Sequence, residues 1–180
     1  MLYIYYIVMS KKTMDEILDY LNNLNPFPSK NPIKDKTRMN VVGGKEKAEE
    51  EKPVLSFSLG LTRAYDKPYL VPSASNRKFP DLHILLKRLM KEKDPSFKYT
   101  TITINKNVKT EWHTDKNNIG KSFGLSLGDF KGGGIEIKYE NDNVKFLDTH
   151  NKLVLFDGHL EHRTLPYKGD RYSITYFKKK

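Results

Sequence analysis

Residues 98–105 read Lys98-Tyr99-Thr100-Thr101-Ile102-Thr103-Ile104-Asn105, and the alternation of polar residues with Ile102 and Ile104 predicts a strand with one apolar and one polar face. Five more short β-rich runs follow, separated by Gly, Asn and Asp turns: Ser122 to Leu127, Gly134 to Tyr139, Val144 to Leu147, Leu153 to Phe156 and Arg171 to Phe177. This succession predicts a β-sandwich or barrel. The polar face then lines a ligand cavity or faces solvent.

Helices are expected only in the N-terminal half. The spacing of apolar residues predicts one helix over Thr13 to Leu24, begun by a Thr13 cap, and another over Phe79 to Lys91. Between them, Val54 to Leu61 is expected to be a strand, and residues 26–53 a mobile loop, because few large apolar residues occur there. The opening run MLYIYYIVM is expected to be a buried strand, since it is far shorter than the about 20 residues of a spanning helix.

These elements predict one integrated domain. Residues 1–97 would form a supporting region of helices, a strand and the mobile loop, and residues 98–180 a β-rich core. The fold class is therefore mainly β with N-terminal helices (α+β).

Composition narrows the function classes. The 180 residues include 32 Lys and Arg against 22 Asp and Glu, for a net charge of +10, and no cysteine. The absence of cysteine excludes disulfide-linked partners, Cys-ligated zinc, iron–sulfur clusters and thiol catalysis. The charge favours a polyanionic partner such as nucleic acid, although an AT-rich genome gives the same lysine-rich composition. No targeting or membrane signal is recognised, so an intracellular location in cytoplasm or nucleus, including that of a virus-infected host, is expected.

Two His-x-carboxylate pairs are candidate metal ligands, because side chains at i and i+2 of a strand point to one face. They are His113-Thr114-Asp115 and His159-Leu160-Glu161. A 2-His-1-carboxylate Fe(II) site needs a third ligand from another strand. Downstream of the first pair His162 can supply it, whereas the only histidine after the second pair is the adjacent His162, which is too near in sequence to come from another strand. The first pair is preferred, and His159 and Glu161 are expected at a loop or rim.

Arg171 opens the last β-rich run. Alternation places Arg171 and Ser173 on one face, where a guanidinium and a hydroxyl can together bind a carboxylate, as of a dicarboxylate cosubstrate. A surface arginine at a strand start has the same pattern. The Gly128 to Gly134 segment lacks the Lys-Ser/Thr of a phosphate loop and is expected to be a tight hairpin with positive φ angles.

The C-terminal half resembles the Fe(II)/2-oxoglutarate-dependent dioxygenases, most closely the TET/JBP-like nucleic-acid-modifying branch with its viral and algal relatives. Four elements in order carry the resemblance. They are Thr100 to Asn107, His113 to Ser122, Gly128 to Gly133, and the closing group of Phe156-Asp157-Gly158, His162, Pro166, Gly169 and Arg171-Tyr172-Ser173.

The resemblance implies a double-stranded β-helix (jelly roll) with Fe(II) at its open mouth. By this likeness His113, Asp115 and His162 are the metal ligands, and Arg171 binds the distal carboxylate of 2-oxoglutarate. Ser173 and Asn105 would assist in binding the cosubstrate. O₂ is the second cosubstrate, and a C–H bond is oxidised while 2-oxoglutarate becomes succinate.

The resemblance also implies a substrate, the methyl group of a pyrimidine (5-methylcytosine or thymine) in nucleic acid, DNA rather than RNA, with base flipping from a duplex. Asn117 and Asn118 would contact this substrate, the Lys-rich residues 30–52 would bind its backbone, and Trp112 is expected in the core rather than stacked on a base. Two alternatives are a prolyl or lysyl protein hydroxylase and a non-catalytic jelly-roll binding module.

Overall fold

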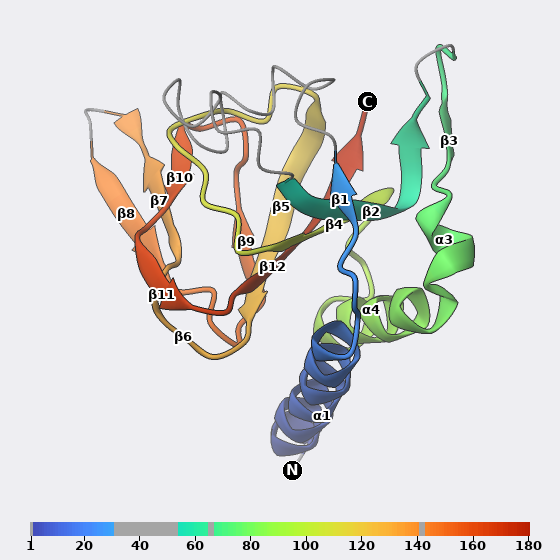
Figure 1. The fold of residues 1–180 in the computed structure, drawn as a ribbon. Helices are drawn as coiled ribbons and strands as arrows, with labels where there is room; N and C mark the ends of the chain where they lie inside the picture. The colour runs from blue at the N-terminus through green and yellow to red at the C-terminus, as the bar shows by residue number, and fades with distance from the viewer. Residues whose placement is uncertain (1, 31–53, 65–66, 141–142) are drawn as a thin grey trace.

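The computed structural model describes residues 2–30, 54–64, 67–140 and 143–180 (Figure 1). The helices are α1 (Leu2–Asn22), α3 (Ser75–Lys78) and α4 (Pro80–Lys93). The strands are β1 (Ser29–Lys30), β2 (Val54–Arg63), β3 (Leu70–Pro72), β4 (Thr101–Lys106), β5 (Asn118–Leu127), β6 (Phe130–Gly132), β7 (Ile135–Lys138), β8 (Val144–Leu147), β9 (Val154–Phe156), β10 (His162–Thr164), β11 (Tyr167–Gly169) and β12 (Tyr172–Lys179).

The strands form one large and two small antiparallel sheets. The major sheet has the order β1-β2-β4-β12-β5-β9, with β3 paired to β2. The minor sheet has the order β10-β7-β8, and β11 pairs with β6. In Figure 1, α1 and α4 lie side by side beneath the major sheet, and β7, β8, β10 and β11 are grouped at the left.

The two faces of the major sheet differ because side chains alternate along each strand. On one face, Ile102 and Ile104 of β4 and Ile174 of β12 are fully buried against the helices. On the other face, Thr103 and Asn105 of β4 line a cavity. The predicted polar face therefore lines a cavity and does not face solvent.

The helices attach to the apolar face through both packing and hydrogen bonds. Leu82, Leu86, Leu89 and Met90 of α4 are buried in the core, together with Ile17 and Leu21 of α1. The buried hydroxyls of Tyr172 and Tyr176 donate hydrogen bonds to the carbonyl oxygens of Leu21 (3.2 Å) and Leu86 (2.9 Å). Each tyrosine thus satisfies its polar atom while filling the core.

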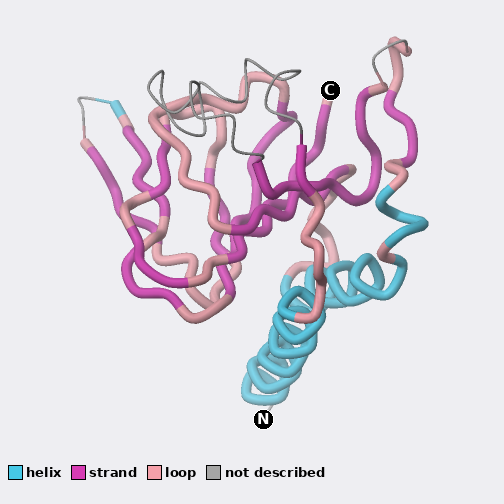
Figure 2. Tube along the Cα trace, viewed as in Figure 1, coloured by secondary structure: helices cyan, strands magenta, loops and turns pink. Residues whose placement is uncertain are grey.

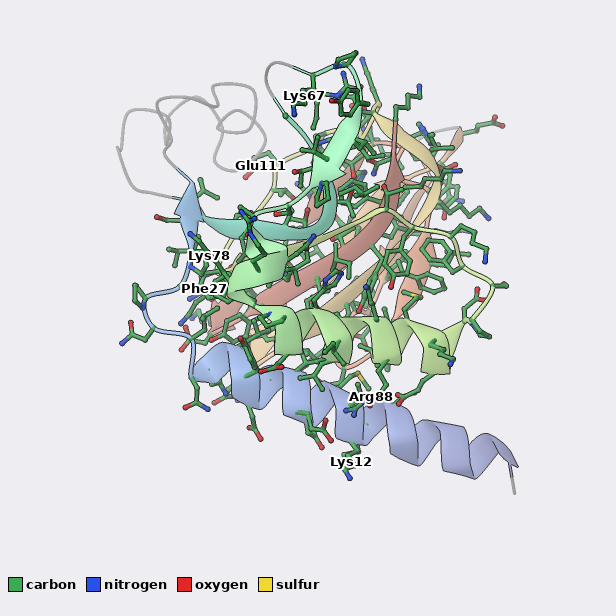
Figure 3. The ribbon with its side chains drawn as sticks, turned by 90° about the vertical axis from the view of Figure 1, so that its right-hand side faces the viewer. Lys12, Phe27, Lys67, Lys78, Arg88 and Glu111 are labelled. Atoms are coloured by element: carbon green, nitrogen blue, oxygen red, sulfur yellow. The ribbon has the colours of Figure 1, made fainter. Side chains whose placement is uncertain are left out.

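Polar contacts also join the two helices. Arg88 of α4 forms an ion pair with Glu16 of α1, and its Nε donates to the Thr13 hydroxyl (3.2 Å). Figure 3 shows Arg88 between the two helices. In Figure 2 the cyan helices α1, α3 and α4 lie together, apart from most of the magenta strands.

Most expected elements are confirmed, with mainly β structure after the N-terminal helices. The six predicted β-rich runs correspond to β4, β5, β7, β8, β9 and β12, and the predicted strand at Val54 and helix at Phe79 correspond to β2 and α4. Short β1, β3, β6, β10 and β11 were not expected. The core contains buried residues from both sides of residue 97, such as Leu59 and Ile104, while the division of the chain at that residue stays a prediction.

The expectation of an N-terminal strand is wrong. Residues 2–9 belong to α1, which continues through Ser10-Lys11-Lys12 into the predicted amphipathic helix. No Gly or Pro interrupts this stretch, and extending an existing helix costs less than starting one, which outweighs the β-propensity of the opening run. The predicted Thr13 cap is also wrong, because Thr13 lies inside α1 and its hydroxyl donates to Glu92 Oε1 (3.0 Å).

One loop prediction needs correction, and most of the other concerns residues that the structure does not describe. Of the expected mobile loop, residues 31–53 lie outside the described residues, as does nearly all of the Lys-rich 30–52 segment. Its described start is ordered, since Phe27 is buried against Phe57 and Tyr172. The Gly128 to Gly134 segment has the expected positive φ values at Gly128, Gly132, Gly133 and Gly134, but it is not a tight hairpin, because β6 pairs with β11 instead of β5.

Among the described residues, no helix has the length and apolar character needed to cross a membrane.

Candidate metal centre

The three expected metal ligands lie together at a cavity of about 360 Å³ between the major and minor sheets. One ligand atom from each of His113, Asp115 and His162 lies within 4.8 Å of the other two. In the part of the chain that the structure describes, no other group of His, Cys, Asp or Glu meets this condition. His113 and Asp115 come from the segment between β4 and β5, and His162 begins β10.

Backbone pairing brings the two histidines together. The His113 N–H donates to the His162 carbonyl (3.1 Å), and the His162 N–H donates to the His113 carbonyl (2.9 Å). This reciprocal bridge extends the minor sheet by one residue pair. The ring centroids of the two histidines are 4.2 Å apart.

Both imidazoles are held in one tautomer. His113 Nδ1 lies 2.7 Å from the Glu111 carbonyl oxygen, and His162 Nδ1 lies 2.8 Å from the Leu160 carbonyl oxygen. A carbonyl can only accept, so each Nδ1 donates its proton. Each Nε2 is then left with a lone pair for a metal ion, as is usual for metal-binding histidines.

The electrostatics of His162 favour the same state. Burial lowers the pKa of His162 below its ordinary value, and the neighbouring His113 ring lowers it further. The neutral imidazole, which is the form that binds metals, is therefore favoured. His162 Nε2 lies 4.0 Å from Asp115 Oδ2.

The donor set fits Fe(II). Two neutral imidazole nitrogens and one carboxylate on one side of a cavity are the ligands of the non-haem Fe(II) facial triad, which leaves open coordination positions for other molecules. These residues could hold the metal that the sequence implies.

Arg171 is buried beside the cavity and lines it. Arg171 is 3% exposed, its Nη2 donates to Ser126 Oγ (2.7 Å), and its buried Nε has no hydrogen-bond partner among the residues that the structure describes. Burial lowers the pKa of Arg171 to about 10, so the guanidinium still carries its charge at neutral pH. Among the described residues, no carboxylate forms an ion pair with Arg171.

A buried, unpaired guanidinium is costly to keep without an anion. The surroundings nevertheless fix it in place, with Tyr167 and Phe130 rings 5.2 and 5.6 Å from Cζ. Gly133 makes room for it, since a Cβ there would lie 3.2 Å from Arg171 Nε. This arrangement fits a bound carboxylate better than a surface arginine.

The other expected cosubstrate residues share this cavity. Ser173 and Asn105 both line it, and Asn105 Nδ2 donates to Ser173 Oγ at 3.3 Å. Their strands are paired at this position in the major sheet. The sequence did not single out Ser126 or Asn107, whose side-chain carbonyl accepts from the Arg171 backbone N–H (2.8 Å). The alternation of Ser126 with Leu125 and Leu127 is the sequence pattern that could have identified Ser126 as facing away from the apolar core.

The two expected substrate residues differ in their surroundings. Asn117 is exposed, whereas Asn118 is 6% exposed and its amide donates to Asp115 Oδ2 (3.2 Å). The rival pair lies in the loop between β9 and β10, in agreement with the expected loop or rim position. His159 and Glu161 are exposed, and Glu161 forms an ion pair with Lys138 (3.4 Å).

Trp112 is not a core residue, contrary to expectation. It is partly exposed, with Arg163 Cζ 4.7 Å and Lys138 Nζ 5.2 Å from its ring centroid. The bridge between His113 and His162 places Trp112 next to Arg163, one residue out of phase with the ligands. Adjacent residues of paired strands point to opposite faces, so Trp112 belongs to the outer face of the minor sheet.

No protein-family model matches the chain, and no curated protein does. Solved structures do share its fold. An oxidoreductase of the 2OG-Fe(II) oxygenase family from Burkholderia pseudomallei has a TM-score of 0.54 and 15% identity, covering 91% of this chain and 75% of that one. NgTET1 in complex with 5mC DNA has a TM-score of 0.50 and 15% identity, covering 69% of this chain and 61% of that one.

A Pseudomonas putida prolyl-4-hydroxylase is more distant, with a TM-score of 0.44 and 12% identity over 93% of this chain and 100% of that one. The likeness to the first two structures confirms the expected jelly roll. At these identities it establishes the fold alone.

Proposed function

We propose that the protein is an Fe(II)- and 2-oxoglutarate-dependent dioxygenase. One observation carries the proposal: the His113, Asp115 and His162 ligand atoms lie within 4.8 Å of one another at a cavity that is also lined by the buried Arg171, which no carboxylate of the described residues pairs with. A site that binds only a metal ion does not need the buried Arg171 guanidinium. A site that binds only a carboxylate does not need the three metal ligands. The two features together match an enzyme that binds both groups.

The residues have separable roles in this proposal. His113, Asp115 and His162 would hold Fe(II), and a set of three protein ligands leaves coordination positions open for the cosubstrates. The Arg171 guanidinium binds the distal carboxylate of 2-oxoglutarate, and Ser173 and Asn105 add polar contacts on the cavity wall. Ile135 and Phe156 supply apolar lining to the cavity.

Bound Fe(II) with 2-oxoglutarate and O₂ supplies the chemistry, in which R–H, 2-oxoglutarate and O₂ become R–OH, succinate and CO₂. The substrate we propose is the methyl group of a pyrimidine in nucleic acid, DNA rather than RNA. The net charge of +10 supports a polyanionic substrate, and NgTET1, which shares the fold, was solved with 5mC DNA.

Mass spectrometry of nucleosides tests this proposal. DNA and RNA are incubated with the purified protein, Fe(II), 2-oxoglutarate and air, with an Asp115→Ala protein as the control. The expected result is an oxidised pyrimidine that forms only with the cosubstrate and with Asp115. Unmodified nucleic acid together with succinate formation would contradict the nucleic-acid substrate and move the search to prolyl and lysyl side chains. No succinate with any substrate would overturn the enzyme class.

A further inference from the structure

The Asp115 ligand lies in a stretch that has no strand of its own to hold it. His113 belongs to a β-bridge and Asn118 begins β5, but residues 114–117 between them belong to no strand and end in a turn at 116–117. The two histidines are each fixed by sheet pairing and by a carbonyl at Nδ1. The orientation of the Asp115 carboxylate must therefore come from other contacts.

Two backbone hydrogen bonds place the Asp115 main chain. Its N–H donates to the Gly158 carbonyl (2.7 Å), and its carbonyl accepts from the Asn118 N–H (3.0 Å). The approach to Gly158 is close, because a Cβ on that residue would lie 3.3 Å from Asp115 Cβ and 3.4 Å from Oδ2. The segment 114–117 is thus packed directly on the loop at 157–160.

The Asn118 side chain then orients the carboxylate. Its Nδ2 donates to Asp115 Oδ2 at 3.2 Å, and the residue is 6% exposed. A buried amide that donates to one carboxylate oxygen restrains rotation of the carboxylate about its last bond. This contact differs from the substrate contact expected from the sequence.

His159 holds Asn118 from the opposite loop. His159 Nε2 lies 2.9 Å from the Asn118 carbonyl oxygen, which can only accept, so the ring nitrogen donates. The other side of the ring is anchored by Asp157, whose Oδ1 lies 3.0 Å from Nδ1 and accepts the His159 backbone N–H at 3.0 Å. Because His159 is exposed, burial in the core does not explain the contacts at both of its ring nitrogens. A role in positioning Asn118 explains them.

We propose that His159 and Asn118 are positioning residues for the Asp115 metal ligand, linked in the order Asp157, His159, Asn118, Asp115. This inference rests on the proposed function for the identity of the metal site. It gives His159, the rejected ligand of the second His-x-carboxylate pair, a role one step behind the metal. Loss of such outer contacts typically lowers metal affinity about 10- to 100-fold.

Metal titration tests the inference without relying on turnover. Trp112, the only tryptophan of the chain, immediately precedes His113, so its fluorescence is expected to report binding. Mn(II) alone is titrated into the full chain without oxygen. The Kd for Mn(II) is expected to rise about 10- to 100-fold in both His159→Ala and Asn118→Ala. His83→Ala, which removes a half-buried histidine from α4, is the matched control and is expected to leave the Kd unchanged.

The double variant separates a linked pair from two independent contacts. If His159 acts through Asn118, the His159→Ala, Asn118→Ala double variant should bind Mn(II) no more weakly than Asn118→Ala alone. A multiplicative loss would contradict the link. His159→Gln keeps an N–H donor and should recover most of the affinity, which also guards against a folding defect in His159→Ala.

The outcomes distinguish this inference from the proposed function. Wild-type Mn(II) affinity in His159→Ala, together with lost binding in Asp115→Ala, would overturn the positioning role and leave the metal site intact. Failure of the wild-type chain to bind Mn(II) or Fe(II) would overturn the proposed function itself.

Discussion

The two faces of the major sheet are built by the same strands, but one face packs against the helices and the other lines the cavity. Along β12, Tyr172, Ile174 and Tyr176 are at most 2% exposed and pack toward the helices. The residues between them, Ser173 and Thr175, line the cavity. A change on the first face is expected to cost stability and a change on the second to cost activity, although the residues are neighbours in sequence.

The residues of the cavity face contribute less to the hydrophobic core, because their polar groups hydrogen-bond to one another or are available to bind a ligand. Arg171 is the clearest case, since it is as buried as the core residues but has no anionic partner among the described residues. Such a group destabilises the fold unless a ligand compensates it. Sites of this kind are where a sequence departs from the rules of good packing.

The largest expected effect is on the cavity face, at the ligand His113. His113→Ala should abolish turnover, because two ligands do not hold the metal that three hold. The melting temperature should stay within a few degrees of wild type, since His113 is only partly buried and no core contact is lost. Succinate assays and thermal unfolding measure the two properties. Turnover at the wild-type rate would remove His113 from the site.

Arg171 gives the next largest effect. Arg171→Ala removes a charge-assisted pair worth about 3 kcal/mol, so the 2-oxoglutarate concentration for half-maximal turnover should rise roughly 100-fold. Arg171→Lys keeps the charge but not the planar fork and should fall in between. Unchanged dependence on 2-oxoglutarate in the alanine variant would show that another residue binds the cosubstrate.

On the core face, Ile174→Ala should lower stability and leave the site intact. Removing a fully buried isoleucine costs about 2–5 kcal/mol in the free energy of unfolding, or roughly 5–15 °C in melting temperature. The adjacent Ser173→Ala is the matched variant, expected to change 2-oxoglutarate affinity and not the melting temperature. Equal destabilisation by both would erase the distinction between the faces.

The smallest effect is expected at the tyrosine hydroxyls beneath the sheet. Tyr176→Phe removes the hydrogen bond to the Leu86 carbonyl, at a cost of about 1 kcal/mol. The ring and its packing are retained. Denaturant unfolding should detect the loss, while turnover by the folded protein should be unchanged. A loss of turnover in the folded variant would mean that the core face also shapes the site.

The sequence predicts those parts of this arrangement in which apolar residues recur at the regular spacing of a strand or a helix. The alternation of Thr103 and Asn105 with Ile104 predicted both faces of β4, and the spacing of Leu82, Leu86 and Leu89 predicted α4. The backbone bridge that brings His113 to His162 spans 49 positions, which local patterns do not encode. The pairing of these residues was suggested by the need for a third ligand from another strand and by the family resemblance.

Errors arose where one signal outweighed another. Residues 2–9 have high β-propensity, but continuity with the helix that follows makes them helical. Trp112 was expected in the core because of its size, yet its phase relative to His113 places it on the outer face. The contact of Asn118 with the Asp115 carboxylate could not be predicted from the sequence, because it depends on the geometry of the turn, and its expected contact with substrate stays a prediction.

Succinate formation from 2-oxoglutarate tests the central claim most directly, because it depends on both the triad and Arg171 and not on the choice of substrate. Purified protein is supplied with Fe(II), O₂, 2-oxoglutarate and ascorbate, which serves as the reductant in place of a C–H substrate, beside Asp115→Ala at equal concentration. Succinate that forms with the wild-type chain and disappears in the variant is the predicted result. Equal succinate from both proteins, or none from the wild-type chain, would contradict the claim that these residues form a dioxygenase site.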